Sequence, residues 1–125
     1  MRRFNPSSPW PERAVQAWQI LTGAAMLRRS LTYEDLSVLM YRREAAGVIQ
    51  QILAHVAYYC RQEGLPILTV IVVGKDRGAP GLEIPVPSGD FDSERERVFR
   101  EDWFDIYPPT ADEFAAAYAS FQARG

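Results

Sequence analysis

The chain has 125 residues, of which 47% are hydrophobic and 24% are charged, a composition typical of a single soluble globular domain. No apolar run approaches the roughly 18 residues that a membrane-spanning helix needs, and the N-terminal MRRFNPSSPW lacks the apolar stretch of a secretory signal. The single cysteine, Cys60, cannot form an internal disulfide. We therefore expect a protein without a membrane span, in a reducing compartment such as the cytoplasm.

The net charge of −2 hides an asymmetry along the chain. Residues 1–43 carry a balance of +4, residues 44–80 are neutral, and residues 81–125 carry −6. Such a distribution allows two arrangements. Either the basic and acidic surfaces face each other, or the basic surface is open to an anionic partner.

The first part of the chain predicts an arm followed by a helix. Residues 1–9 contain Pro6, Pro9 and two serines, so we expect a flexible arm whose end is fixed by Trp10. A helix is predicted from there to Arg29, with proline in its first turn. Its inner stripe is Ala14, Trp18, Leu21 and Ala25, and we expect Trp18 to be a core residue.

A short helix and a long helix follow. Thr32-Tyr-Glu-Asp35 is a capping-box pattern, and the helix it opens is predicted to end near Met40. The stretch from Tyr41 to Gly64 is predicted as one long amphipathic helix with a glycine cap. Its apolar face holds Ala45, Val48, Ile49, Ile52, Leu53, Val56, Tyr59 and Cys60, and its opposite face holds Arg43, Gly47, Gln50, Ala54, Tyr58 and Arg61. Two helices joined this tightly are typical of a helix-turn-helix.

The next segment predicts a β-hairpin. The apolar run from Ile67 to Val73 is predicted as a strand, and the glycine-rich residues 74–81 as a turn. Leu82 to Val86 is predicted to return as an edge strand, because Pro85 and Pro87 exclude a central one. A hairpin in this position is a wing.

The remainder predicts two further helices. The first is expected to be capped by Asp92 or Ser93 and to turn Val98, Phe99 and Trp103 inward, with Phe104 and Ile106 close behind. The second opens with the capping box Thr110-Ala-Asp-Glu113 and carries Phe114, Tyr118 and Phe121 on one stripe. The prediction is therefore an α+β, mostly helical fold: an arm (1–9), a winged helix-turn-helix core (10–87) and a two-helix C-terminal extension (88–125) that packs on the core.

Three stretches resemble the DNA-binding domain of alkylguanine-DNA alkyltransferases and alkyltransferase-like proteins: TYEDLS at residues 32–37, AAGVIQQIL at residues 45–53, and Leu65-Pro66 followed by Val72-Val73. The family carries a TYGE-type helix start, an A-A-R-A-V-G-x-A-L recognition helix and an L-P-x-P-C-H-R-V-V segment before a glycine turn. The resemblance covers residues 31–81 and implies a DNA-binding winged helix. The overall layout also resembles that of small uncharacterised bacterial proteins, which implies no activity.

The chain departs from the family at the residues that do the chemistry. The arginine finger falls on Gly47, the nucleophilic cysteine on Thr69, and the family's histidine and arginine on Val70 and Ile71. Thiolate attack needs an activated cysteine beside a base. The resemblance therefore implies architecture without alkyl transfer, and we expect a protein that is not an enzyme.

Other chemistry-bearing residues favour structural roles. We expect His55 to be a packed or surface histidine and Cys60 a small buried hydrophobe. The acids Asp90, Asp92, Glu94 and Glu96 lack the glycine and the terminal glutamate of a calcium loop, so a solvated, helix-capping role is predicted for them. Neither a metal nor a cofactor is expected.

Two binding functions stay open. For duplex DNA, Arg42 and Arg43 would contact the DNA at the start of the recognition helix, Gln50 and Gln51 would read base edges, and Lys75 and Arg77 would reach phosphates. The alternative is a protein-interaction adaptor or anti-defence-type protein that uses the same face. A continuous positive strip from Arg42 to Arg77 would favour DNA, and an apolar or acidic patch would favour a protein partner.

Overall fold

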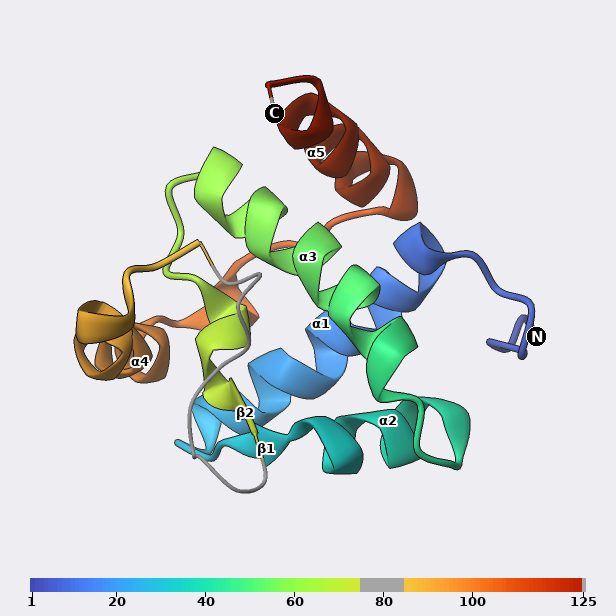
Figure 1. Ribbon diagram of the computed structural model, residues 1–125, viewed down its shortest axis with the longest axis horizontal. Helices are drawn as coiled ribbons and strands as arrows, with labels where there is room; N and C mark the ends of the chain where they lie inside the picture. The colour runs from blue at the N-terminus through green and yellow to red at the C-terminus, as the bar shows by residue number, and fades with distance from the viewer. Residues whose placement is uncertain (75–84, 125) are drawn as a thin grey trace.

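The computed structural model describes residues 1–74 and 85–124, and within them the chain is mostly helical, with one pair of short strands (Figure 1). The elements are α1 (Trp10–Met26), β1 (Leu31–Thr32), α2 (Tyr33–Tyr41), α3 (Ala46–Gln62), 3₁₀ helix η1 (Leu68–Ile71), β2 (Val72–Val73), 3₁₀ helix η2 (Ser88–Asp90), α4 (Phe91–Arg100), 3₁₀ helix η3 (Trp103–Asp105) and α5 (Ala111–Arg124). The α+β, mostly helical class is confirmed.

Both predicted capping boxes are present. Thr32 Oγ1 accepts the Asp35 N–H at 3.0 Å, and Asp35 Oδ2 accepts the Thr32 N–H at 3.4 Å. At the start of α5, Thr110 Oγ1 accepts the Glu113 N–H at 3.2 Å and Glu113 Oε1 accepts the Thr110 N–H at 3.0 Å. Each box satisfies backbone donors that a helix start would otherwise leave unpaired.

The central helix α3 is shorter than predicted at its start. Tyr41 belongs to α2, and Arg42 adopts a left-handed backbone with φ of 63°, which ends that helix. Four residues later α3 begins at Ala46. Its end agrees with the prediction, because Gly64 has φ of +71° and the Leu65 N–H donates to Cys60 O at 2.9 Å.

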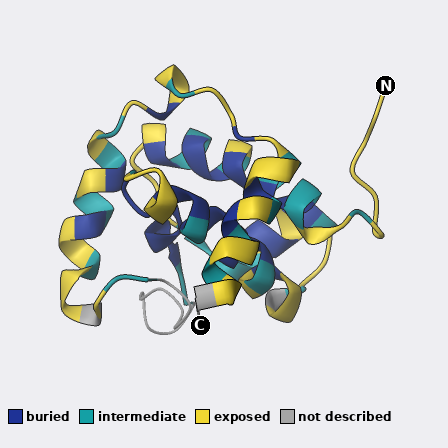
Figure 2. Ribbon diagram, turned by 90° about the horizontal axis from the view of Figure 1, so that it is seen from above, coloured by how far each residue is buried: buried dark blue, intermediate teal, exposed yellow. Residues whose placement is uncertain are grey.

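The core surrounds α3, which packs against α1 on one side and α5 on another (Figures 1 and 2). The predicted apolar face is buried at Ile49, Ile52, Leu53, Val56 and Cys60. The opposite face, on which Gln50 and Gln51 were predicted to bind a partner, is covered in its middle by α5, while Gly47, Gln50 and Arg61 are exposed. Ala54 and His55 are buried as well, and the ring of Tyr58 stacks on Phe121 at 3.7 Å.

The aromatic residues of the core tie α5 and η3 to α1. Trp18 is 3% exposed, as predicted for a core residue. Its ring lies edge-on to Trp103 at 5.5 Å and to Tyr59 at 5.8 Å, and it meets Phe114 at 6.0 Å. Such edge-to-face pairs add to the free energy gained by burying the rings. The C-terminal segment therefore shares one core with the preceding helices.

The strand predicted from Ile67 to Val73 was too long. Leu68–Ile71 form a buried 3₁₀ helix, and only Val72–Val73 extend, pairing in parallel with Leu31–Thr32. A continuous apolar run fits a buried helical turn as well as a strand, because it has no period of its own. The predicted turn and most of the returning strand lie outside the described residues, while Pro85 and Val86 form a bend. The wing therefore stays a prediction.

Helix α4 differs from the prediction at its start and at one carboxylate. Asp90 rather than Asp92 or Ser93 precedes the first turn, and it makes no side-chain cap. Glu94, predicted to be solvated, is buried. Its Oε2 accepts the Ile67 N–H at 2.7 Å and its Oε1 accepts from Arg97 at 2.7 Å, so it fixes α4 to the start of η1. Val98 and Trp103 are buried as predicted, but Phe104 is 67% exposed.

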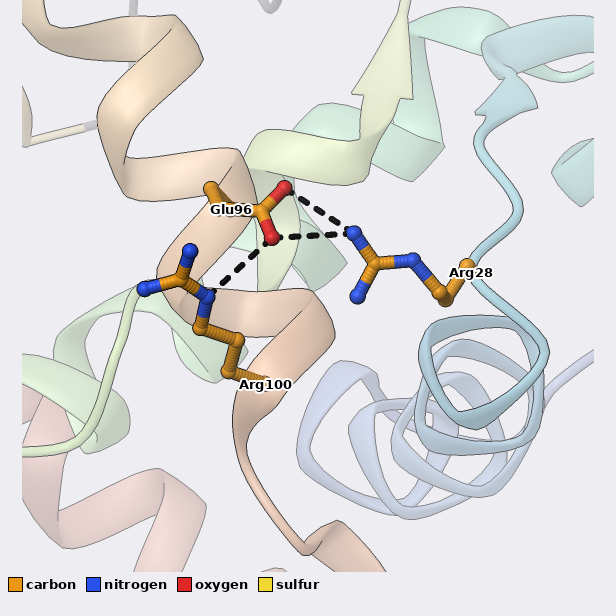
Figure 3. Close-up of polar contacts among 3 residues, drawn as sticks. All are labelled: Arg28, Glu96 and Arg100. Atoms are coloured by element: carbon orange, nitrogen blue, oxygen red, sulfur yellow. Dashed lines mark hydrogen bonds and ion pairs between the residues drawn. The ribbon is translucent and has the colours of Figure 1, made fainter.

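One ion pair among the described residues joins the basic and acidic parts of the chain (Figure 3). Arg28 Nη2 donates to both oxygens of Glu96, at 2.9 and 3.0 Å, and Arg100 Nε donates to the same carboxylate at 3.2 Å. The hydrogen bond from Arg28 is the main cause that lowers the pKa of Glu96. Among the described residues, this is where opposite charges of the two regions pair.

Replacing Ile52 by aspartate should abolish cooperative folding. Ile52 is fully buried; its burial contributes about 1.5–3 kcal/mol, and an unpaired charge there costs several kcal/mol more. Val48→Asp is the matched control on the same helix, because Val48 is 36% exposed, and it should change the free energy of unfolding by only about 0.5 kcal/mol. Thermal unfolding followed by circular dichroism measures both. A parent-like transition in Ile52→Asp would contradict the packing of α3.

Candidate nucleic-acid interface

The N-terminal arm is held against the body of the protein by Arg13. Arg13 lies in the first turn of α1 and is buried, and its Nη2 donates to Asn5 O at 2.6 Å. A second contact is exposed: Arg2 Nη2 lies 3.1 Å from Glu12 Oε1. The arm itself turns at Asn5, whose carbonyl accepts the Ser8 N–H at 3.0 Å. Residues 1–9 thus lie alongside the start of α1.

The same guanidinium fixes the end of α2. Arg13 Nη1 donates to Met40 O at 2.8 Å and to Gln16 Oε1 at 2.7 Å. Carbonyls in the last turn of a helix lack partners within the helix, so a cation there satisfies one and interacts favourably with the helix dipole. The guanidinium also lies over the Tyr41 ring, 4.2 Å from its centroid. Arg13 therefore joins the arm, α1 and α2.

A cleft of about 670 Å³ opens between these three segments and the loop that leads into α3. We call it the arm cleft. Its lining contains five arginines, three aromatic residues and no aspartate or glutamate: Arg2, Arg3, Phe4, Asn5, Pro6, Ser8, Trp10, Arg13, Gln16, Leu39, Met40, Tyr41, Arg42, Arg43 and Val48. In a chain with a net charge of −2, this concentration of guanidinium groups gives the cleft a positively charged lining.

Most of these arginines are available to a ligand. Arg3, Arg42 and Arg43 are exposed and form no ion pair with any residue that the structure describes. Arg2 is paired with Glu12, but its side chain is 91% exposed, and such a pair contributes little to stability. Each of the four can therefore bind an anion without breaking a buried contact.

Of the six residues predicted to bind a partner, the structure describes four, and only two of these line the arm cleft. Arg42 and Arg43 line the arm cleft, although they lie in the loop before α3 rather than within that helix. Gln50 is exposed on α3. Gln51 is half-buried, and its Oε1 accepts from the Tyr118 hydroxyl of α5 at 3.1 Å, so it is engaged within the protein. Lys75 and Arg77 lie outside the described residues.

Sequence reasoning missed the contribution of the arm. Arg2, Arg3, Phe4 and Trp10 line the cleft beside Arg42 and Arg43, although about 40 residues separate the two groups in the chain. The signal that could have found them is the balance of +4 over residues 1–43. Only the fold shows that the arginines at both ends of that segment share one surface.

The groups predicted to be chemically inert lie in the core. Cys60 is fully buried, and burial raises the pKa of its thiol to about 12. Thr69, the position that matches the family's nucleophile, is also fully buried, and its hydroxyl makes no hydrogen bond within the described part of the chain. Within that part there is also no group of three or more His, Cys, Asp or Glu residues that could hold a metal ion.

His55 is packed between α3 and α5. Its ring stacks on Tyr118 with centroids 4.0 Å apart, and its Nδ1 lies 2.7 Å from Gln51 O. Because a carbonyl only accepts, Nδ1 carries the proton. Burial lowers the pKa of His55, and the backbone hydrogen bond opposes that shift. Of the two roles predicted for His55, packed or at the surface, the structure shows the packed one.

No described helix is both long and apolar enough to cross a bilayer. Comparison of the chain with protein families, curated proteins and solved structures finds no match. The arm cleft itself is therefore the basis for a functional proposal.

Cys60 should not react in the folded protein. Its pKa of about 12 and its full burial leave almost no accessible thiolate at neutral pH. The thiol reagent DTNB should label the protein only after unfolding in denaturant, and methylated DNA should transfer no methyl group to it. Stoichiometric labelling of the folded protein would contradict the burial of Cys60, and stoichiometric methylation would also contradict the expectation that the protein transfers no alkyl group.

His55 should titrate below its ordinary value of 6.5. It is the only histidine in the chain, so an NMR pH titration follows it without ambiguity. The unfolded state takes up the proton first as pH falls, so the free energy of unfolding should decrease from about pH 6.5 down through the lower folded pKa. His55→Gln should remove this part of the dependence. A folded pKa at or above 6.5 would contradict the packing.

Proposed function

We propose that the protein is a non-enzymatic nucleic-acid-binding protein that uses the arm cleft. The observation that carries the proposal is the lining of five arginines without a carboxylate. Guanidinium groups bind phosphate oxygens in bidentate pairs, and nucleic-acid surfaces are recognised first through their phosphates. The negative charge elsewhere on the chain would orient the arm cleft toward the nucleic acid and keep other faces away from it.

The covered position of α3 limits how this surface could meet a duplex. Contacts along the length of α3 are blocked where α5 packs on it, at Ala54, Tyr58 and Gln51. Gly47, Val48 and Gln50 are exposed near its start. We therefore propose that the start of α3 and the adjoining loop approach the groove, with Gln50 as the residue for base edges.

A second candidate is a protein partner, as expected of an adaptor or anti-defence-type protein. The observation that favours it is apolar: Leu39 is 55% exposed and Val48 is 36% exposed, and both line the arm cleft beside Arg42 and Arg43. Such a surface would fit an acidic protein segment with apolar anchors. Because the lining is rich in arginine, we rank nucleic acid above a protein as the ligand of the arm cleft.

Binding should depend steeply on salt. Contacts from Arg2, Arg3, Arg42 and Arg43 to about four phosphates imply a slope of log affinity against log salt near −3.6. Affinity for duplex DNA should then fall roughly 150-fold between about 50 and about 200 mM salt. Arg42→Gln combined with Arg43→Gln should flatten the slope by about 2. Fluorescence anisotropy with labelled duplexes at several salt concentrations measures this.

The matched control is Arg29→Gln combined with Arg61→Gln, which changes the charge equally. Arg29 follows the far end of α1, and Arg61 lies in the last turn of α3, so both are away from the arm cleft. This control should keep the parental slope. Gln50→Ala should alter sequence preference more than salt dependence. Absence of binding at about 50 mM salt, or equal losses in both double variants, would exclude this surface as a nucleic-acid interface and favour the protein partner.

A further inference from the structure

The arm cleft combines its arginines with two aromatic rings that remain accessible. Phe4 is 40% exposed and Trp10 is 43% exposed. The third ring of the lining, Tyr41, is covered by the guanidinium of Arg13 at 4.2 Å. Trp10 has one described ring neighbour, His55, which is tilted by 69° at 6.4 Å, so no ring is stacked on Trp10 within the described residues. The Arg13 guanidinium also lies over one face of the Phe4 ring, but farther away, 5.9 Å from its centroid. Trp10 and the other face of Phe4 therefore remain for stacking on a planar ligand.

We propose that the arm cleft binds single-stranded nucleic acid, with bases stacked on Trp10 and Phe4 and phosphates bound by Arg3, Arg42 and Arg43. This inference rests on the proposed function and narrows the ligand from nucleic acid in general to single strands. In a duplex the bases are already stacked on each other and turned inward, so side-chain rings stack mainly on unpaired bases. The anionic contacts alone would suit either form, whereas the exposed rings suit only the single strand.

The size of the cleft agrees with this ligand. Its volume of about 670 Å³ lies within the roughly 300–1,000 Å³ of small-molecule sites, which is room for a base and its neighbouring phosphates. Two accessible rings, together with three arginines that form no ion pair with any described residue, exceed what one mononucleotide can use. The composition therefore favours successive nucleotides of a strand over a free nucleotide.

Arg13, which lines the cleft, has one donor without a described partner. Its Nη1 and Nη2 are bonded to protein oxygens, but the third donor, Nε, is buried and makes no hydrogen bond with any described residue. A buried donor without a partner carries a cost in free energy. An oxygen that a ligand brought into the cleft could remove this cost.

The distribution of tryptophans makes the stacking directly measurable. Trp18 is 3% exposed and Trp103 is 1% exposed, so Trp10 alone among the three tryptophans is open to collisional quenching. Oligothymidylate and oligouridylate of about 12 nucleotides should quench its fluorescence and shield it from acrylamide. They should also bind more tightly than a duplex of the same length in anisotropy titrations. Comparing the two oligomers shows whether DNA or RNA is preferred. A titration with adenosine monophosphate tests whether a free nucleotide binds as well.

Three variants test the role of the rings. Trp10→Ala and Phe4→Ala should each weaken single-strand binding about 5-fold to 150-fold while leaving the salt slope unchanged. Trp10→Phe keeps a ring, so it should retain most of the affinity. It should lose the ligand-induced quenching, because the fluorescence of Trp10 is gone. Phe104→Ala removes a ring that is 67% exposed and does not line the arm cleft; it should bind like the parent. Circular dichroism checks that each variant folds.

The outcomes separate this inference from the proposed function. If duplex binding is salt-dependent but single strands bind no better and leave Trp10 unquenched, the single-strand inference is overturned and the proposed function stands. Adenosine monophosphate binding as tightly as the oligomers would also overturn it, in favour of a free nucleotide. If no nucleic acid binds at about 50 mM salt, both proposals are wrong, and an acidic protein partner is the reading to test next.

Discussion

The enclosure of α3 on two sides is the constraint on which the rest of the structure depends. Helix α1 packs against one side and α5 against another, so residues 52–57 of α3 are all buried. Burial of each large aliphatic residue there contributes about 1.5–3 kcal/mol, which makes the helix the centre of the core. The same packing leaves α3 exposed mainly at its two ends, around Gly47 to Gln50 and at Arg61 and Gln62. The loop and the N-terminal arm lie at the first of these ends, beside the arm cleft.

The charges of the chain follow this arrangement. The acidic C-terminal region forms an ion pair with the basic N-terminal region through Arg28 and Glu96 at the far end of α1. Arg3, Arg42 and Arg43, at the other end, form no ion pair with any described residue. Of the two arrangements that the charge asymmetry allowed, the first is present at the Arg28 end, and the second is what we propose for the arm cleft. The exposed Arg28–Glu96 pair lies where α4 packs beside α1, and the arginines at the other end line the arm cleft.

Features that depend on neighbouring residues could be predicted from the sequence, whereas contacts between distant segments could not. The capping boxes at Thr32 and Thr110 and the glycine cap at Gly64 depend on neighbouring residues alone, and all three are present. The covering of Ala54 and Tyr58 was missed because both residue types occur on exposed and buried faces alike. The run before Val72 gave no period with which to separate a strand from a buried turn. Of the residues that line the arm cleft, the sequence predicted only Arg42 and Arg43 as binding residues, because the rest of the binding surface comes from the distant arm.

The double engagement of Arg13 couples the two walls of the arm cleft. One guanidinium donates to Asn5 O of the arm and to Met40 O at the end of α2, and these two segments are the walls of the cleft. If either segment moved, one of the two hydrogen bonds would lengthen or break. A displacement of the arm and a displacement of the end of α2 would each cost this guanidinium a hydrogen bond. A lysine, whose three donors share a single nitrogen, lacks the two separate nitrogens that make these bonds. The separation of the walls is therefore encoded at one position in the sequence, and a substitution there would alter the width of the cleft without touching the residues at its rim.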